Sequence, residues 1–251
     1  MTPLTERERT RYARHLTLPL IGEAGQEKLK AARVLVVGIG GLGSSAALYL
    51  AGAGVGTLGF VDPDSVTLSN LQRQVIHGSS SLGRPKVDSA HDRIGDLNED
   101  IEVETHPISF SAENGRRIAA GYNLIVDGTD NFQTRYAIND TCLELGIPYV
   151  YGAIFRLEGQ VSLLCTDSGP CYRCLFPKPP SGAALRGEKE GILGAIPGTI
   201  GTLQATVAIK WIVGIEPHPV GQLLLFDARA MRLEAIEVAA NPRCPSCGNC
   251  P

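Results

Sequence analysis

The chain has 251 residues, enough for one large α/β domain or two modest ones, and its 43% hydrophobic content is ordinary for a folded protein. The formal net charge of -3 argues against a nucleic-acid or anionic-membrane partner, because both favour a basic face. The N-terminal segment 1–16 is too charged for a signal peptide, so we expect a cytoplasmic protein.

The uncharged stretch 34–61 exceeds the roughly 20 residues that a membrane helix needs. Glycines interrupt it in clusters that make turns. A buried strand, a helix and a second strand are therefore favoured over a membrane span.

The first half of the chain alternates between strand and helix patterns. Thr5 and Glu8 form a capping-box pattern that predicts a helix over 5–16. After it come a strand at 33–38, a helix at 42–54, a strand at 57–62, helices near 86–97, 112–120 and 132–145, and strands at 101–106, 123–127 and 148–153. This alternation predicts an α/β fold with a Rossmann-like, doubly wound, mainly parallel sheet.

The second half has a different texture. Segments 158–165 and 221–238 are typical of antiparallel strands, separated by a Pro/Gly-rich stretch at 177–191 and a helix around 199–213. We expect one domain made of an N-terminal helical arm (1–32), a nucleotide-binding half (33–153) and a mixed or antiparallel half (154–251).

A glycine-rich turn links the first strand to the second helix. Gly38, Gly40 and Gly41 leave room for phosphate to approach backbone N–H groups at a helix N-terminus. Asp62, about twenty residues later, is placed to accept hydrogen bonds from ribose hydroxyls. Both features fit either NAD or ATP.

The segment after Asp62 favours a nucleoside triphosphate. Asn70, Arg73, Gln74 and Lys86 are candidate donors to a longer phosphate chain than a dinucleotide carries. The alternative for each residue taken singly is a solvated surface position.

Asp130 and Asn131 follow the strand that ends at Asp127. A carboxylate at this edge of a parallel sheet, beside a triphosphate, is a natural Mg²⁺ ligand, so Asp130 is the metal candidate. The alternative is an N-cap for the next helix, a role that residues 127–131 share among them.

Four of the seven cysteines form two Cys-x-x-Cys pairs, Cys171 with Cys174 and Cys244 with Cys247. Two such pairs can supply four thiolates to one tetrahedral zinc ion. A redox role needs only one pair, so structural zinc is favoured. We expect the remaining cysteines to lie in a predicted helix (Cys142), at the end of a buried strand (Cys165) and in the tail (Cys250).

A series of motifs runs in order along nearly the whole chain: GIGGLG, AGVG, DPD, SNLQRQ, GRPK, DGTDN, CYRCLFP, GILG, GTLQA and CPSCG. Together they resemble the MoeB/ThiF family of ubiquitin-activating-like adenylyltransferases. SNLQRQ with the paired cysteine motifs is far more specific than the glycine turn.

The resemblance implies a homodimer that binds ATP with Mg²⁺ and adenylates the terminal glycine of a ubiquitin-like sulfur-carrier protein (MoaD- or ThiS-like) ending in Gly-Gly. It also implies zinc at the two cysteine pairs. It assigns roles by position: Gly41 to a phosphate, Asp62 to the ribose, Asn70, Arg73 and Lys86 to the triphosphate, Asp130 to the metal, and Arg14 to the partner subunit's site. The predicted catalytic residues are therefore Arg14, Arg73, Lys86 and Asp130.

One departure from the family pattern concerns sulfur. Many family members carry a cysteine shortly before the GILG motif, and this chain has Gly187 at the corresponding position. The departure affects any covalent second step and not the adenylation. We expect a separate sulfurtransferase to deliver the sulfur.

Three alternatives remain at this level. One is a related enzyme that activates a modified nucleoside in tRNA, which a basic surface or extension would favour. The second is an NAD-dependent oxidoreductase, permitted by the glycine turn and disfavoured by SNLQRQ. The third is a zinc-stabilised scaffold that binds carriers without turning over ATP.

Overall fold

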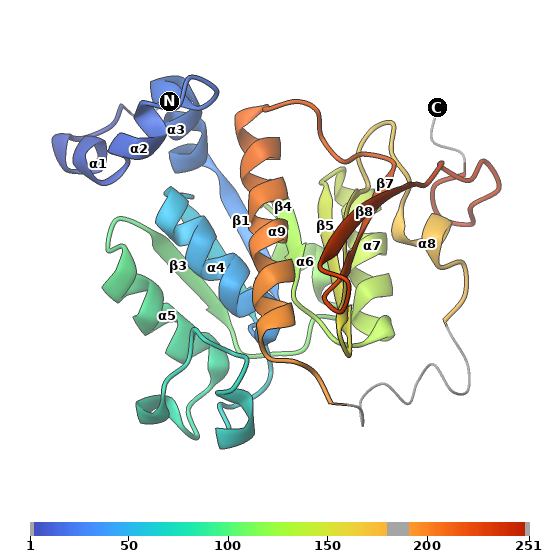
Figure 1. Cartoon of the computed structure of the whole chain (residues 1–251), viewed down its shortest axis with the longest axis horizontal. Coiled ribbons are helices and arrows are strands. Elements are labelled where there is room, and N and C mark those ends of the chain that lie inside the picture. Colours follow the sequence, from blue (N-terminus) through green and yellow to red (C-terminus); the bar gives the residue numbers. More distant parts are fainter. Residues whose placement is uncertain (1–2, 180–190, 249–251) are drawn as a thin grey trace.

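One sheet organises the chain, with helices on both of its faces (Figure 1). The computed structural model describes residues 3–179 and 191–248. Its strand order is β3-β2-β1-β4-β5-β6-β7-β8. The parallel part contains β3 (Glu102–His106), β2 (Thr57–Val61), β1 (Arg33–Val37), β4 (Leu124–Asp127) and β5 (Tyr149–Phe155). The antiparallel part adds β6 (Glu158–Leu164), β7 (Gln222–Asp227) and β8 (Arg232–Glu237). The predicted mainly parallel sheet with an antiparallel continuation is confirmed.

Strand β1 has an almost continuous apolar sequence because helices cover both faces of the parallel part. Side chains alternate between the faces of a strand. Val34 and Val36 accordingly belong to one hydrophobic core, whereas Leu35 and Val37 belong to a second core on the opposite face. All four are buried, as expected for the centre of a parallel sheet.

Two groups of helices enclose these cores. The first core includes residues of α4 (Gly41–Ala53), α5 (Lys86–Leu97) and α9 (Ala195–Val213). The second includes residues of α6 (Gly115–Ala119), α7 (Phe132–Leu145) and α8 (Tyr172–Leu175). Helices α4 and α9 approach closely at Gly201, where an added Cβ would lie 2.2 Å from the carbonyl oxygen of Leu42.

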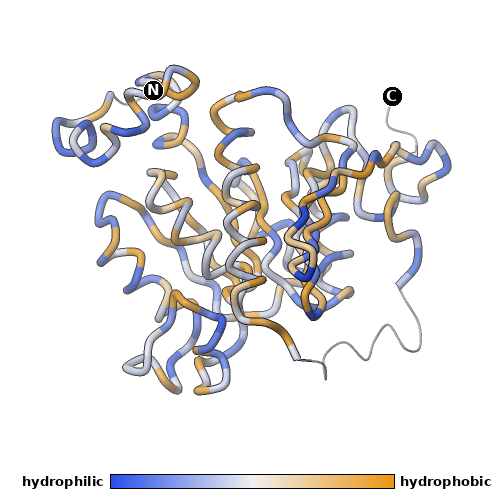
Figure 2. The backbone as a smooth tube through the Cα atoms, in the orientation of Figure 1, coloured by the Kyte–Doolittle hydropathy of each residue, from blue (hydrophilic) through white to orange (hydrophobic). Residues whose placement is uncertain are grey.

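Helix α9 is apolar or neutral over most of its length (Figure 2). It begins at Ala195, four residues before the predicted start, because Pro197 lies in the first turn, where a missing N–H costs no helical hydrogen bond. Helix α6 instead begins later than predicted. The Asn114 side chain accepts a hydrogen bond from the backbone N–H of Ser111 (2.9 Å) and closes a turn there.

The N-terminal arm contains α1 (Glu6–Arg11), α2 (Ala13–Leu16) and α3 (Gly22–Ala31). The predicted capping box is present: Thr5 Oγ1 accepts from the Glu8 N–H at 3.2 Å, and Glu8 Oε2 accepts from the Thr5 N–H at 2.7 Å. The single helix predicted over 5–16 is wrong, because the structure interrupts it at Tyr12. Helix α3 was not predicted.

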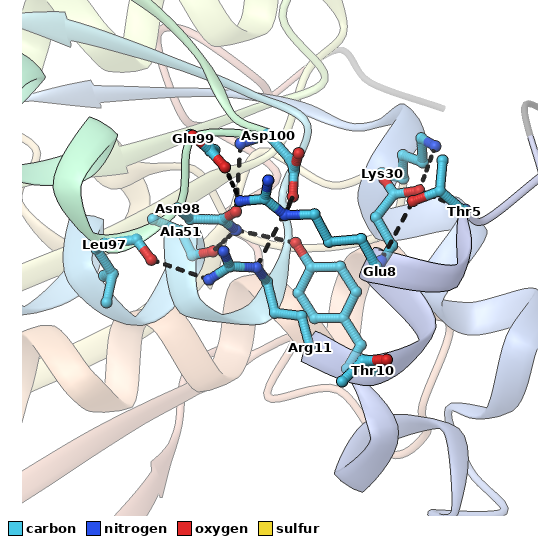
Figure 3. Close-up of polar contacts among 12 residues, drawn as sticks. Thr5, Glu8, Thr10, Arg11, Lys30, Ala51, Leu97, Asn98, Glu99 and Asp100 are labelled. Carbon is cyan, nitrogen blue, oxygen red and sulfur yellow. Dashed lines mark hydrogen bonds and ion pairs between the residues drawn. The ribbon is translucent and has the colours of Figure 1, made fainter.

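Contacts with the α5–β3 loop explain the interruption at Tyr12 (Figure 3). The ring of Tyr12 is buried, and its hydroxyl accepts a hydrogen bond from the Asn98 amide at 2.9 Å. Next to it, Arg11 donates to the carbonyl oxygen of Leu97 at 2.9 Å. The arm is thus attached to the end of α5 and to the start of the loop that leads into β3.

Two short 3-10 helices, η1 (Leu68–Asn70) and η2 (Ser79–Ser81), lie in the connection between β2 and α5. Among residues 3–179 and 191–248, no helix has both the length and the hydropathy that crossing a bilayer requires.

Candidate functional site

A cavity of about 870 Å³ opens at the carboxyl ends of the parallel strands. The loops that follow β1, β2 and β4 form one side of it, and β5 and β6 form the other. Open parallel sheets bind ligands at this edge. The predicted site residues that line the cavity are Gly38, Gly40, Gly41, Asp62, Arg73, Gln74, Lys86, Asp130 and Asn131.

The glycine turn connects β1 to the N-terminus of α4. Gly38 has a φ of 87°, in the left-handed region that favours glycine, and its backbone packs against Gly128 in the turn after β4. Helix α4 begins at Gly41 and is 13 residues long, so its first N–H groups and its dipole favour an anion in the cavity.

Asp62 directly follows β2 and fixes the glycine turn. Its carboxylate accepts hydrogen bonds from the N–H of Ile39 (2.8 Å) and of Asp64 (2.9 Å). Burial raises the pKa of Asp62, and the nearby Lys86 ammonium works in the opposite direction.

Lys86 is the first residue of α5, and its side chain is only 7% exposed. The ammonium lies 2.8 Å from Asp64 Oδ2 and 3.8 Å from Asp62 Oδ1. The alternative of a solvated surface charge is therefore wrong for Lys86. Its charge is held at the cavity wall beside the glycine turn.

The SNLQRQ motif contributes Arg73 and Gln74 to the lining but not Asn70. Arg73 donates to the carbonyl oxygen of Ser69 at 3.1 Å, and the buried Gln74 Oε1 has no hydrogen-bond partner among the described residues. The Asn70 side chain instead closes a capping box with Thr67 around η1. Its predicted contact with a triphosphate stays a prediction.

The polar residues at the loop between β4 and α7 make different contacts. Asn131 is the N-cap of α7 and accepts from the N–H of Thr134 at 2.9 Å. Asp127 is fully buried and accepts from Thr129 and from the Tyr149 hydroxyl (2.7 Å). The Asp130 side chain neither caps α7 nor forms a hydrogen bond in the core. It is exposed at the cavity wall, where its carboxylate is accessible to a cation.

Arg135 lines the cavity and was not predicted. Its side chain is 8% exposed, donates to the carbonyl oxygen of Thr129 at 2.8 Å and lies 3.6 Å from Asp127. Burial opposes ionisation of Arg135, but the neighbouring Asp127 outweighs it and raises the pKa. The only sequence signal was a charged residue on the first turns of a helix after DGTDN, which by itself is typical of a solvated helix face.

The opposite side of the cavity comes from the second half of the chain and from β5. Tyr151 and Phe155 lie on β5 and Gln160 on β6, and the Tyr151 hydroxyl donates to Gln160 Oε1 at 3.0 Å. Aromatic and aliphatic side chains dominate this side, whereas charged groups dominate the side formed by the β1, β2 and β4 loops.

Arg14 lies on α2 in the N-terminal arm and does not line the cavity. Figure 1 shows α2 beside α3 at the end of the sheet where β1 begins, whereas the cavity is at the end where β1 finishes. The Arg14 side chain is exposed. Within one chain it is therefore separated from the other predicted catalytic residues.

The two cysteine pairs come together although about 70 residues separate them. Their four sulfur atoms lie within 4.8 Å of one another and could hold a metal ion. The sulfur of Cys171 is 3.9 Å from Cys174 and 3.5 Å from Cys244, and Cys174 is 3.4 Å from Cys247. Cys142 and Cys165 are buried, as predicted, whereas Cys250 and Gly187 lie outside the described residues.

Comparison with known proteins identifies the family. Residues 12–246 match the ThiF family. The chain belongs to the ThiF family.

The relatives of this ThiF-family chain include enzymes that are named for adenylyl transfer. It is 45% identical to the sulfur carrier protein adenylyltransferase of Thermus thermophilus, over 98% of this chain and 93% of that protein. It is 48% identical to adenylyltransferase and sulfurtransferase MOCS3-2 of Zea mays, over 95% of this chain but about half (50%) of that protein's length.

Solved structures confirm the fold of this ThiF-family chain. Escherichia coli MccB, in a structure with MccA-N7isoASN, has a TM-score of 0.86 and 20% identity, covering 96% of this chain and 75% of that one. At this identity the likeness supports the fold alone.

Proposed function

We propose that this ThiF-family chain is an ATP-dependent adenylyltransferase that activates the C-terminal glycine carboxylate of a ubiquitin-like sulfur-carrier protein. One observation carries the proposal: a single cavity gathers the glycine turn with Asp62, Arg73, Lys86 and Asp130. The relationship to the Thermus thermophilus enzyme over nearly the full length of both proteins supports the same activity.

The residue types at the cavity suit attack by a carboxylate on the α-phosphate of ATP. A C-terminal carboxylate has a pKa near 3.5 and is already a nucleophile at neutral pH, so no general base is needed. The barrier comes from bringing two anions together and releasing pyrophosphate. Cations that hold the phosphates in line therefore lower it, and Lys86 and Arg73 both line this cavity.

The nucleotide fits the side of the cavity that is formed by the β1, β2 and β4 loops. We assign the phosphates to the N–H groups of Gly40 and Gly41 and the ribose to Asp62. The Gly38 N–H instead donates to the carbonyl oxygen of Val61 at 2.7 Å, so the role of Gly38 is to shape the turn.

Magnesium fits Asp130, an exposed carboxylate at the cavity wall with no hydrogen bond or ion pair among the described residues. A hard carboxylate oxygen suits a hard cation that keeps most of its ligands from water and phosphate. Bound there, Mg²⁺ supplies positive charge to the triphosphate and its leaving pyrophosphate.

We assign the carrier's Gly-Gly terminus to the side formed by β5, β6 and Arg135. A chain end without side chains can enter between aromatic residues such as Tyr151 and Phe155, and the buried Arg135 guanidinium is a donor for its carbonyl or carboxylate oxygens. In this assignment residues 33–153 bind the nucleotide and also contribute Arg135 and most of β5 to the carrier side, whereas residues 154–251 contribute β6 to that side and bind the zinc.

Arg14 reaches the chemistry only if a second subunit supplies it, because its own cavity is at the opposite end of the sheet. We therefore propose a homodimer in which each Arg14 completes the partner's site. A comparable arginine supplied in trans in phosphoryl transfer contributes on the order of 10³ to 10⁵ in rate.

Mixing two inactive variants tests this dimer. In a mixed dimer of Arg14→Ala and Asp130→Ala both substitutions fall in the same site and the other site is intact, so random reassociation restores about a quarter of wild-type activity. As a control, each variant dissociated and reassociated alone stays inactive. No recovery in verified mixed dimers contradicts the exchange of Arg14 between subunits.

The cysteine cluster fits zinc. Tetrahedral Zn–S bonds of about 2.3 Å separate the sulfur atoms by about 3.8 Å, near the 3.4 to 3.9 Å seen here. These separations are too long for a disulfide. Four protein ligands leave no open position for substrate, so the zinc is structural.

Sulfur enters in a later step. With Gly187 at the position of the usual cysteine, we propose that this chain makes the acyl-adenylate and that a separate sulfurtransferase delivers the sulfur. Adenylation needs none of the cysteines.

Exchange of labelled pyrophosphate into ATP tests the activity. We expect exchange only when Mg²⁺ and a carrier ending in Gly-Gly are present, and none with tRNA in place of the carrier. Asp130→Ala abolishes exchange while changing the free energy of unfolding by less than about 0.5 kcal/mol, because the side chain is exposed. The matched control is Asp167→Ala, an exposed aspartate outside the cavity lining, which keeps full exchange.

Two results contradict the proposal. Exchange with tRNA alone selects a tRNA-modifying enzyme, and no exchange together with NAD binding selects an oxidoreductase. Full exchange by Asp130→Ala with unchanged magnesium dependence removes Asp130 as the metal ligand.

A further inference from the structure

His77 is a buried histidine that connects two walls of the cavity without lining it. Its Nε2 lies 3.0 Å from the carbonyl oxygen of Ile39 in the glycine turn, and its Nδ1 lies 3.0 Å from Oγ of Ser89 on α5. His77 itself is three residues after Gln74, in the segment that also contributes Arg73 to the cavity lining. Its imidazole therefore connects this segment to both the glycine turn and α5.

The two hydrogen bonds determine the form of the ring. A carbonyl oxygen can only accept, so Nε2 must carry the proton and donate to Ile39. In the neutral ring Nδ1 then accepts from the hydroxyl of Ser89. Burial lowers the pKa of His77, which favours this neutral form.

The bond to Ile39 fixes the direction of the next N–H. In a trans peptide the C=O and the following N–H point in opposite directions. Because the Ile39 carbonyl is turned toward His77, the Gly40 N–H points away from His77, and Gly40 lines the cavity. That N–H has no hydrogen-bond partner among the described residues.

The backbone N–H of Ile39 also has a fixed partner. The Ile39 N–H donates to Asp62 Oδ2 at 2.8 Å, so both polar backbone groups of Ile39 have a fixed partner. Asp62 in turn lies 3.8 Å from the Lys86 ammonium.

The bond to Ser89 fixes α5 relative to the glycine turn. Ser89 lies three residues after Lys86, so the two are neighbours on one face of the helix, and both are buried. His77 thereby holds the turn that presents Gly40 at a set position relative to the start of α5, from which Lys86 extends.

We propose that His77 is a positioning residue that aims the Gly40 N–H and the Lys86 ammonium at the same triphosphate of the nucleotide. The inference rests on the proposed function, since it takes ATP as the ligand. His77 sets the affinity for the triphosphate and leaves the affinity for the carrier unchanged, because its contacts are all on the nucleotide side.

Binding of MgATP to two variants tests the proposal by calorimetry. His77→Leu removes both hydrogen bonds, and we expect the Kd for MgATP to rise at least about tenfold. His77→Gln keeps a side-chain N–H donor for the Ile39 carbonyl, so we expect it to stay within about threefold of wild type. The Kd for the carrier stays unchanged in both, and in the exchange assay the KM for ATP rises while the KM for the carrier does not.

A milder variant keeps the test informative if His77→Leu fails to fold. Ser89→Ala removes only the donor to Nδ1 and is expected to weaken MgATP binding by about threefold. Its control is Ser162→Ala, which removes one hydrogen bond from another buried serine, to the Gln222 carbonyl, and leaves MgATP binding unchanged.

The binding data distinguish a failure of the role of His77 from a failure of ATP binding itself. MgATP binding at wild-type strength by Ser89→Ala and by every folded His77 variant overturns the role of His77 alone. Equal loss in His77→Gln and His77→Leu also overturns it, because the retained donor should rescue binding. Wild-type protein that binds no MgATP overturns the proposed function and this inference together.

Discussion

Gly40 and Gly41 are adjacent, but the fold requires glycine only at the second. A Cβ on Gly41 would lie 2.8 Å from Pro197 Cβ on α9, whereas a Cβ on Gly40 would meet only Gln74 Nε2, at 3.6 Å. The protein itself has room for a methyl group at residue 40. We therefore attribute the absence of a side chain there to the phosphate that we propose for the cavity.

The two alanine variants therefore differ in kind. We expect Gly41→Ala to lower the free energy of unfolding by about 1 to 3 kcal/mol through overpacking. Gly40→Ala costs less than about 1 kcal/mol as an N-cap change. It nevertheless raises the Kd for MgATP at least about tenfold, since the methyl group occupies the approach of the phosphate. Thermal unfolding and calorimetric titration measure the two effects, and unchanged MgATP binding by Gly40→Ala contradicts the phosphate assignment.

The sequence predicted site residues that lie within a recognisable motif. Asp62 and Lys86 belong to DPD and GRPK, and both line the cavity. His77 and Arg135 could not be found in this way, because their partners are distant in sequence or lie on the backbone. His77 acts on Ile39 and Ser89, and Arg135 donates to a carbonyl of Thr129.

At the scale of single elements, polar contacts add to the burial of apolar side chains in holding the N-terminal arm (Figure 3). Glu8 accepts from Lys30 at 2.8 Å in addition to closing the capping box with Thr5. Burial opposes ionisation of Glu8, but the hydrogen bonds from Lys30 and Thr5 outweigh it and lower the pKa below the usual 4.5.

Glu8→Gln tests this contact because glutamine keeps the capping box and loses the charge. We expect a loss of about 1 to 2 kcal/mol in the free energy of unfolding at pH 7. The folded-state pKa is depressed, so the stabilisation is complete above the unfolded pKa and is lost as the pH falls through the folded pKa. The variant and wild type should therefore converge in acid.

The control is Glu6→Gln on the same helix, whose carboxylate is 97% exposed and should contribute less than about 0.5 kcal/mol. A Glu8→Gln deficit that persists unchanged at pH 3, below the usual carboxylate range, contradicts the ion pair with Lys30 as its cause.

Elements with strong local signals were predicted, and those held by tertiary contacts were not. The capping box at Thr5 and the apolar strand β1 are local features. Helix α3 contains polar residues and two glycines, and it depends on burying Leu29 and Gln26 against the rest of the chain. The interruption at Tyr12 likewise follows from its contact with Asn98, 86 residues away.

At the scale of the whole molecule, the cysteine cluster joins the C-terminal segment to the region around α8. Cys171 and Cys174 lie at α8, whereas Cys244 and Cys247 lie beyond β8. The sequence predicted the cluster because four thiols at two Cys-x-x-Cys spacings have few other uses. It could not predict that Cys171 and Cys244 are buried in the second core.

Zinc removal tests this role. We expect one zinc per chain, and removal by a chelator under reducing conditions should lower the unfolding midpoint by on the order of 10 °C. Cys244→Ser should lose most of the zinc and show the same shift. Ser246→Ala, an exposed position within the same motif, should keep both the metal and the midpoint. Freshly prepared, reduced protein that contains no zinc contradicts the assignment.

The continuous sheet brings the charged and the aromatic sides of one cavity together from the two halves of the chain. In that arrangement we expect the carboxylate of the carrier to attack the α-phosphate of ATP. Local sequence patterns predicted the charged side, whereas the aromatic side required the antiparallel pairing of β5 with β6.

Isotope tracing tests this attack most directly. A carrier in which both oxygens of the C-terminal carboxylate are a heavy isotope is incubated with the enzyme, MgATP and hydroxylamine, which captures the acyl group. We expect one labelled oxygen in AMP and none in pyrophosphate, because the carboxylate oxygen forms the bond to the α-phosphorus. Label in inorganic phosphate, or AMP formed without label, would contradict it.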